Sequence, residues 1–158
     1  MSVVEHRAHA ALLTGDIGTE QEAALLQTLE PVALLKLPHH GSKTSTSDAL
    51  LDVTHPCLAV AQLGPHGRYD HPHVSVLRRL AAHGVPLWRT DLHGTIEVAF
   101  DAEAIWLRTY GRDRHWSPWQ HVPTASCGRA THHDLVPTAW PFQALRERSP
   151  PVTAATTG

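Results

Sequence analysis

Residues 32–42 read VALLKLPHHGS and join an apolar run to two adjacent histidines. The run at residues 32–37 follows Pro31 and is typical of a buried strand. His39 and His40 therefore stand where this strand ends and the chain leaves the sheet. Because neighbouring side chains at a strand end point in opposite directions, we expect at most one of the two rings to face a shared site.

The segment before this strand has the same organisation. Residues 8–14, AHAALLT, form a short apolar run that ends in Gly15 and Asp16, as expected for a buried strand leading into a polar loop. Residues 19–30 then predict a helix of about three turns, with Thr19 as its N-cap and Glu22 completing a capping box. A right-handed crossover through this helix would bring both strand ends to one edge of the sheet.

Strands and helices keep alternating further along the chain. The expected elements are a short helix through residue 51 capped by one of residues 45–47, a strand at residues 57–63, a helix from Pro72 to His83, a short strand at residues 85–89, and a hairpin of residues 95–100 with 104–109. This order predicts an α/β (α+β) fold with a mixed sheet, flanking helices and a C-terminal hairpin.

The periodic pattern stops after Tyr110. We therefore expect residues 1–110 to form the folded unit and residues 111–158 to form an irregular, partly disordered tail. The tail contains several tryptophans, and burying such a large apolar side chain contributes roughly 1.5 to 3 kcal/mol. One stretch of the tail is thus expected to pack onto the edge of a sheet.

The composition limits the possible functions. Thirteen basic and fifteen acidic residues give a net charge of −2, so any contact with DNA must be local. Cys57 and Cys127 lie too far apart for a paired motif and are expected to be buried or free thiols. No membrane segment or signal peptide is recognisable, so the chain itself is expected to be soluble. The fourteen histidines are scattered, which argues against a metal-buffering tract.

Asp16 and His40 are the first candidates for a site. A carboxylate together with an imidazole suits a divalent ion such as Zn or Mn, but a catalytic zinc takes about three protein ligands, so this pair alone is too small. Asp16 has an alternative role as a cap for the following helix. His71 and His73 stand at a predicted helix N-terminus, where a neutral ring is favoured and can bind a ligand, and for His73 a plain surface position is equally compatible.

Three strings occur in an order and spacing that resemble one family. They are LLTGDI at residues 12–17, LLKLPHHGSKTSTS at residues 34–47, and GRYDHPHVSVLRRLAAHGVPLWRTDLHGTIEV at residues 67–98. Together they resemble the C-terminal metallo-β-lactamase-fold hydrolase domain of ComEC-type competence proteins. The resemblance covers residues 10–98 and implies that this chain forms half of an αββα sandwich.

The resemblance also implies roles for particular residues. Asp16 matches the metal-bridging carboxylate and His40 the late strand-end histidine, with His39 as the less favoured ligand of a dinuclear Zn or Mn centre. The resemblance places Ser42 beside this centre and implies that Tyr69 and His71 line the cleft, so these three are the candidate catalytic residues. It further implies that residues 89–91 support the last strands.

In a complete domain of this family, the metal centre would activate water for attack on a phosphodiester, and the substrate in competence would be single-stranded DNA. The present chain lacks the HxDxDH-like cluster of the first half and starts about midway through the expected sandwich. It also lacks the channel region by which the full-length family is associated with the bacterial inner membrane.

Two interpretations follow from this departure. The first is a hydrolase half domain that becomes active when the missing N-terminal half-domain, or self-association, completes it. The alternative is a non-catalytic remnant or binding module that retains a weak metal site. In either case, a half sandwich is expected to expose an apolar face and an unpaired strand edge, which favours association.

Overall fold

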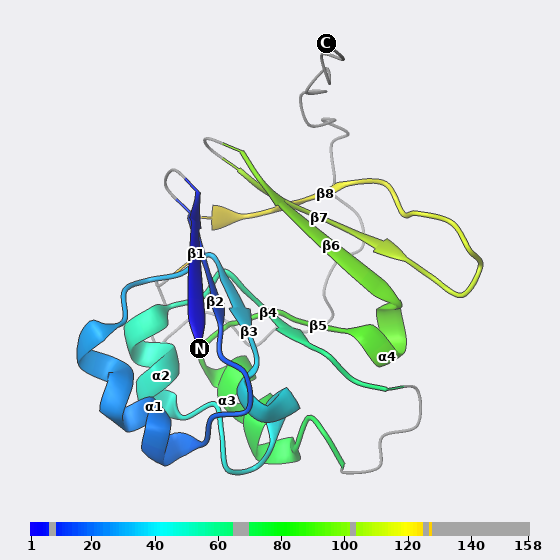
Figure 1. The fold of residues 1–158 in the computed structure, drawn as a ribbon. Helices are drawn as coiled ribbons and strands as arrows, with labels where there is room; N and C mark the ends of the chain where they lie inside the picture. The colour runs from blue at the N-terminus through cyan, green and yellow to red at the C-terminus, as the bar shows by residue number, and fades with distance from the viewer. Residues whose placement is uncertain (7–8, 65–69, 102–103, 125–126, 128–158) are drawn as a thin grey trace.

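The computed structural model describes residues 1–6, 9–64, 70–101, 104–124 and 127, and within them the chain forms two sheets (Figure 1). The first sheet has the order β1-β2-β3-β4-β5, in which β1 is antiparallel to β2 and the other pairs are parallel. The second sheet is antiparallel, with the order β6-β7-β8. The strands are β1 Ser2–His6, β2 His9–Leu13, β3 Leu34–Lys36, β4 Leu58–Ala61, β5 Leu87–Arg89, β6 Thr95–Phe100, β7 Ile105–Tyr110 and β8 Gln120–Val122.

The first sheet separates two hydrophobic clusters, because alternate side chains of its strands point to opposite faces. Leu35 and Ala59 pack with Leu50 and Leu80 of the helices on one face. Neighbouring residues such as Leu58 pack with the second sheet on the other face. The helical elements are α1 Thr19–Leu25, η1 Leu26–Thr28, η2 Pro38–Gly41, α2 Asp48–Thr54, α3 Val74–Ala82 and α4 Thr90–His93.

The predicted mixed sheet, flanking helices and closing hairpin are confirmed, and the hairpin strands β6 and β7 lie within a residue of their predicted bounds. Ser47 caps α2, as one of the three predicted alternatives, but the other two helix starts differ from the predictions. Gly18 is the N-cap of α1, and the side-chain oxygen of Gln21 accepts its N–H, so the capping box expected of Thr19 and Glu22 was wrong. At α3 the cap is His73.

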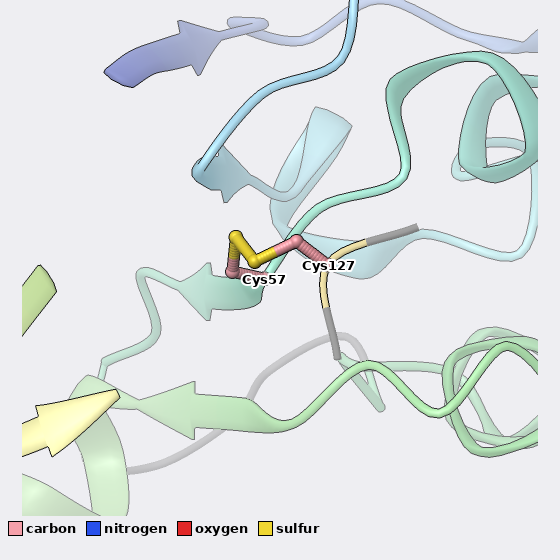
Figure 2. Close-up of a disulfide and its surroundings, with 2 residues drawn as sticks. All are labelled: Cys57 and Cys127. Atoms are coloured by element: carbon pink, nitrogen blue, oxygen red, sulfur yellow. A yellow bond between two sulfur atoms is a disulfide. The ribbon is translucent and has the colours of Figure 1, made fainter. Parts of the chain in front are cut away.

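The expectation that the two cysteines are thiols was also wrong, because Cys57 and Cys127 form a disulfide (Figure 2). Strand β8 precedes Cys127 and lies near Cys57. It extends the second sheet, and its Val122 packs in the same cluster as Cys57, which returns the chain to the start of β4. The two cysteines lie 70 positions apart in the sequence, so local sequence patterns carry no sign of the contact.

Strand β8 lies within the stretch that was expected to be irregular. Trp116 forms an isolated bridge with Tyr110, next to the end of β7. Residues 125–126 and 128–158 lie outside the described part of the chain. None of the helices formed by the described residues has the length and apolar character needed to span a bilayer.

The sheets have open edges among the described strands. β1 pairs with β2 alone and carries the exposed side chains of Val3 and Val4, while Leu13 at the end of β2 is also exposed. In the second sheet, β6 pairs with β7 alone. The expected association through an unpaired edge stays a prediction.

Candidate functional site

Three parallel strands deliver polar groups to one edge of the first sheet. Asp16 follows β2, His40 lies in the turn η2 after β3, and Gln62 follows β4. The loops are tied together, because the backbone N–H of His39 donates to the carbonyl oxygen of Gly15 over 2.9 Å. In sheets of this kind, the carboxyl ends of parallel strands are the usual place for a ligand site.

The ring of His40 is oriented by the backbone. Its Nδ1 lies 2.7 Å from the carbonyl oxygen of Gln62. A carbonyl oxygen only accepts, so Nδ1 carries the proton and donates it. In a neutral ring, Nε2 then holds a lone pair, and it lies 3.6 Å from Oδ1 of Asp16. Two acceptors thus face each other, an arrangement that either a proton on Nε2 or a cation between them stabilises.

The turn that carries the histidines is left-handed over three residues. His39, His40 and Gly41 have φ values of 45°, 57° and 82°. Positive φ is uncommon for residues other than glycine and costs about 1 to 3 kcal/mol where it is held, and such strain clusters at functional sites. Gly41 also contacts the next loop, because a Cβ there would lie 2.8 Å from the Cβ of Pro72.

His39 and His71 form a second pair beside the first. Their ring centroids lie 6.1 Å apart in an edge-on arrangement. Burial lowers the pKa of His71 most, the rings of His39, His40 and His73 lower it further, and Asp70 opposes them. The imidazole of His71 therefore favours its neutral form, which accepts a proton or binds a ligand.

The other predicted site residues have different positions. Ser42 is buried, and its Oγ lies 3.1 Å from Oγ1 of Thr44, so its hydroxyl bonds within its own loop. His73 accepts the backbone N–H of Ser75 at Nδ1 and thereby caps α3. Tyr69 lies outside the described residues.

Within residues 89–91, Thr90 holds the neighbouring loop in place, whereas Arg89 and Asp91 pair with each other. Oγ1 of Thr90 donates to the carbonyl oxygen of Leu63 and accepts its backbone N–H. Asp91 receives two N–H groups of Arg89, at 3.1 and 2.6 Å. This hydrogen bonding is the main reason that the pKa of Asp91 is lowered.

The described residues do not fit a complete catalytic metal site. A catalytic zinc takes about three protein ligands and keeps a position open for water. In the part of the chain that the structure describes, no group of three or more His, Cys, Asp or Glu side chains is arranged to hold a metal ion. Asp16 and His40 offer two donors at most, so further ligands would have to come from elsewhere.

The predictions from sequence did not include two residues that shape this site, Gln62 and Gly41. The Gln62 carbonyl orients His40, but every residue has a carbonyl, so no sequence signal marks it. Gly41 was noted only as part of a motif, although a glycine after two histidines is a usable sign of a left-handed turn.

The fold and this edge define an α/β domain whose polar site lies where parallel strands end. No family model matches the chain. Among curated proteins, the chain is 36% identical over 91 residues to ComE operon protein 3 of Bacillus subtilis, covering 56% of the chain and 12% of that protein. It is 41% identical over 91 residues to competence protein ComA of Neisseria gonorrhoeae, covering 56% of the chain and 13% of that protein.

The chain is also 32% identical over 117 residues to recombination protein 2 of Haemophilus influenzae, covering 74% of the chain and 15% of that protein. These similarities support the resemblance to the ComEC-type competence family. The matches span only 12% to 15% of the three relatives' lengths, so they concern a small part of each protein.

Proposed function

We propose that this chain supplies half of a metal-dependent phosphodiester hydrolase domain that acts on single-stranded DNA during uptake in natural competence. One observation carries the proposal: the Gln62 carbonyl fixes the ring of His40 so that Nε2 faces Oδ1 of Asp16 at 3.6 Å. In known metal sites, backbone carbonyls that accept the other ring N–H orient the ligating histidines in the same way. The similarity to competence protein ComA of Neisseria gonorrhoeae supports the setting in natural competence.

The chain's residues have distinct roles in this proposal. Asp16 and His40 would hold Zn or Mn, the metals that suit a carboxylate with an imidazole. His39 lies against His71 and is the weaker candidate for a ligand. Ser42 stabilises the loop that follows the left-handed turn, and His71, whose ring lies against that of His39, would act on the substrate. A bound metal would supply the activated water for attack on the phosphodiester.

Two ligands are too few, so the site needs a second source of donors. In the full-length family this would be the N-terminal half-domain, joined to parts that associate with the inner membrane. For the chain by itself, the source is a second copy. The open edges at β1 and β6 provide surfaces at which either partner could add.

The alternative is a non-catalytic binding module that retains a weak metal site. The absence of a three-ligand group among the described residues favours it. The two functions differ in what the purified chain does to DNA, because only the hydrolase cleaves it.

We would measure cleavage of labelled single-stranded DNA with Mn²⁺ or Zn²⁺ over a range of chain concentrations. The proposal predicts a metal-dependent rate that rises more steeply than linearly with concentration and is lost in Asp16→Ala and His40→Ala. Glu20→Ala, an exposed change on α1, should cleave like the wild type. No cleavage at any concentration would favour the binding module, and unchanged cleavage in both site variants would refute the assignment of the site.

A further inference from the structure

The loop between β7 and β8, residues 111–119, combines exposed cationic and aromatic side chains. Arg112, Arg114, His115 and Trp116 are all exposed, and Trp116 retains 42% of its accessible surface. The ion pairs between described residues involve neither arginine. The carboxylate of Asp113 accepts the backbone N–H of His115 within the loop. The loop is therefore a local positive and aromatic surface on a chain whose net charge is negative.

Trp116 is held firmly although it is exposed. The guanidinium of Arg108 lies 4.4 Å from the ring centroid of Trp116 and 4.4 Å from that of Trp119, so it is placed against both indoles. Arg108 is itself fixed by Glu97, whose Oε2 accepts its Nε–H over 2.7 Å. The ring of Tyr110 lies 5.3 Å from Trp116. A fixed and partly exposed indole is a suitable platform for stacking, because little side-chain entropy remains to be lost.

The loop's own backbone hydrogen bonds also fix its shape. The N–H of Arg114 donates to the carbonyl oxygen of Gly111, and the N–H of Ser117 donates to that of Thr109. The hydroxyl of Ser117 accepts the N–H of Thr109 in return. The aromatic and cationic groups are thus presented by an ordered turn.

Helix α4 connects the edge at which Asp16 and His40 lie with the end of the second sheet that carries the loop. Strands β2 to β5 are parallel, so the end of β5 at Arg89 shares the edge at which Asp16 lies. Helix α4 then leads to Thr95, which pairs with Tyr110 at the end of β7. Figure 1 shows the loop, in yellow, continuing from the end of β7 that lies next to α4.

We propose that the β7–β8 loop is a binding site for single-stranded nucleic acid, with a base stacked on Trp116 and phosphates near Arg112 and Arg114. The inference deepens the proposed function and rests on it for the identity of the substrate. Stacking on an aromatic ring tolerates any base, and arginines neutralise the backbone, as a sequence-independent site requires.

Binding is best tested without metal, so that cleavage plays no part. Fluorescence anisotropy in EDTA would follow a labelled oligothymidylate and an abasic strand of equal length. We expect Trp116→Ala to weaken oligothymidylate binding about tenfold, with Trp116→Phe retaining most of it. The abasic strand should bind the wild type about as weakly as oligothymidylate binds Trp116→Ala. Changing Arg112 and Arg114 together to Gln should make the logarithmic salt slope about 1.4 less steep.

The controls separate this proposal from the hydrolase proposal. Leu92→Ala changes an exposed apolar residue of α4, and Arg78→Gln removes an exposed charge on α3, so both should bind normally. Asp16→Ala should bind normally while losing cleavage. Equal binding by wild type and Trp116→Ala, in variants with unchanged thermal melts, would overturn the stacking site whatever the cleavage assay shows. Loss of self-association in Trp116→Ala without any loss of DNA binding would instead make this loop a contact between copies.

Discussion

The carboxylate of Glu22 is fully buried and joins the first helix to the start of the second. It accepts the backbone N–H of Thr46 over 2.6 Å and that of Ser47 over 2.9 Å. Each buried donor left without a partner costs about 1 to 3 kcal/mol. We therefore expect Glu22→Ala to lower the free energy of unfolding by about 3 kcal/mol in urea denaturation.

Glu20 is the matched control, because it lies exposed on the same helix. Glu20→Ala should change the free energy of unfolding by less than about 0.5 kcal/mol. If both variants unfolded at the same urea concentration, the two hydrogen bonds would have no energetic importance.

Asp91 makes stability depend on pH. Its pKa is lowered, chiefly by the hydrogen bonds from Arg89, so the carboxylate binds its proton less readily in the folded chain than in the unfolded one. Such a group stabilises the fold above its unfolded pKa and loses this effect as the pH falls through the folded pKa. We expect Asp91→Asn to cost about 1 kcal/mol at pH 7, since the pair is partly exposed. The difference from wild type should shrink below about pH 4 in thermal melts, and a constant difference would contradict this account.

Only some of the contacts at the site could be predicted from the sequence. Asp16 and His40 were predicted to lie at the same edge of the sheet, and Oδ1 of Asp16 lies 3.6 Å from Nε2 of His40. That prediction required only the crossover rule for parallel strands. The edge-on contact of His39 with His71 and the bond from His40 to Gln62 depend on backbone angles and on a loop from a third strand. Neither contact leaves a pattern in the residue types.

The turn η2 and the loop before α3 form one structural unit. The carbonyl oxygen of Gly41 accepts the N–H of His73 over 2.8 Å, and a Cβ on Gly41 would lie 3.1 Å from the Cα of Pro72. Gly41→Ala should therefore cost more than backbone strain alone. Gly15→Ala separates the two effects, because Gly15 also has a positive φ but has nothing within 4 Å of a Cβ.

We expect Gly15→Ala to lower the free energy of unfolding by about 1 kcal/mol and Gly41→Ala by about 2 to 3 kcal/mol. Chemical denaturation followed by circular dichroism would measure both. Equal losses in the two variants would mean that the turn moves away from Pro72 at little cost.

Strands and helices with a clear pattern of apolar residues were predictable from the sequence, and strands without one were not. Strands β2 to β4 come from apolar runs, and the β6–β7 hairpin from strict alternation. Strand β1 was missed because its Val3 and Val4 are exposed at the edge, so burial leaves no alternating pattern. Strand β8 has three residues and forms only because β7 offers a partner.

The disulfide acts on the molecule as a whole. It links the start of β4 to the segment after β8 and closes a loop with a sequence separation of 70 residues. By chain entropy, such a cross-link stabilises a fold by about 4 kcal/mol. Reduction with dithiothreitol should therefore lower the urea midpoint substantially.

The double variant with Cys57→Ser and Cys127→Ser should have the midpoint of the reduced wild type and should not respond to dithiothreitol. A wild type whose midpoint is the same with and without reductant would show that the cross-link contributes no stability. Neither cysteine has a nearby partner in the sequence, which is why this constraint could be found only from the fold.

The most direct test of the account is a calorimetric titration of the chain with Mn²⁺ and with Zn²⁺, because the proposed function depends on Asp16 and His40 acting together as metal ligands. We predict a weak binding isotherm for the wild type that disappears in both Asp16→Ala and His40→Ala. His55→Asn, an exposed change at a left-handed helix end, should titrate like the wild type. Isotherms that stay the same in both site variants, or no binding by the wild type, would contradict the central claim.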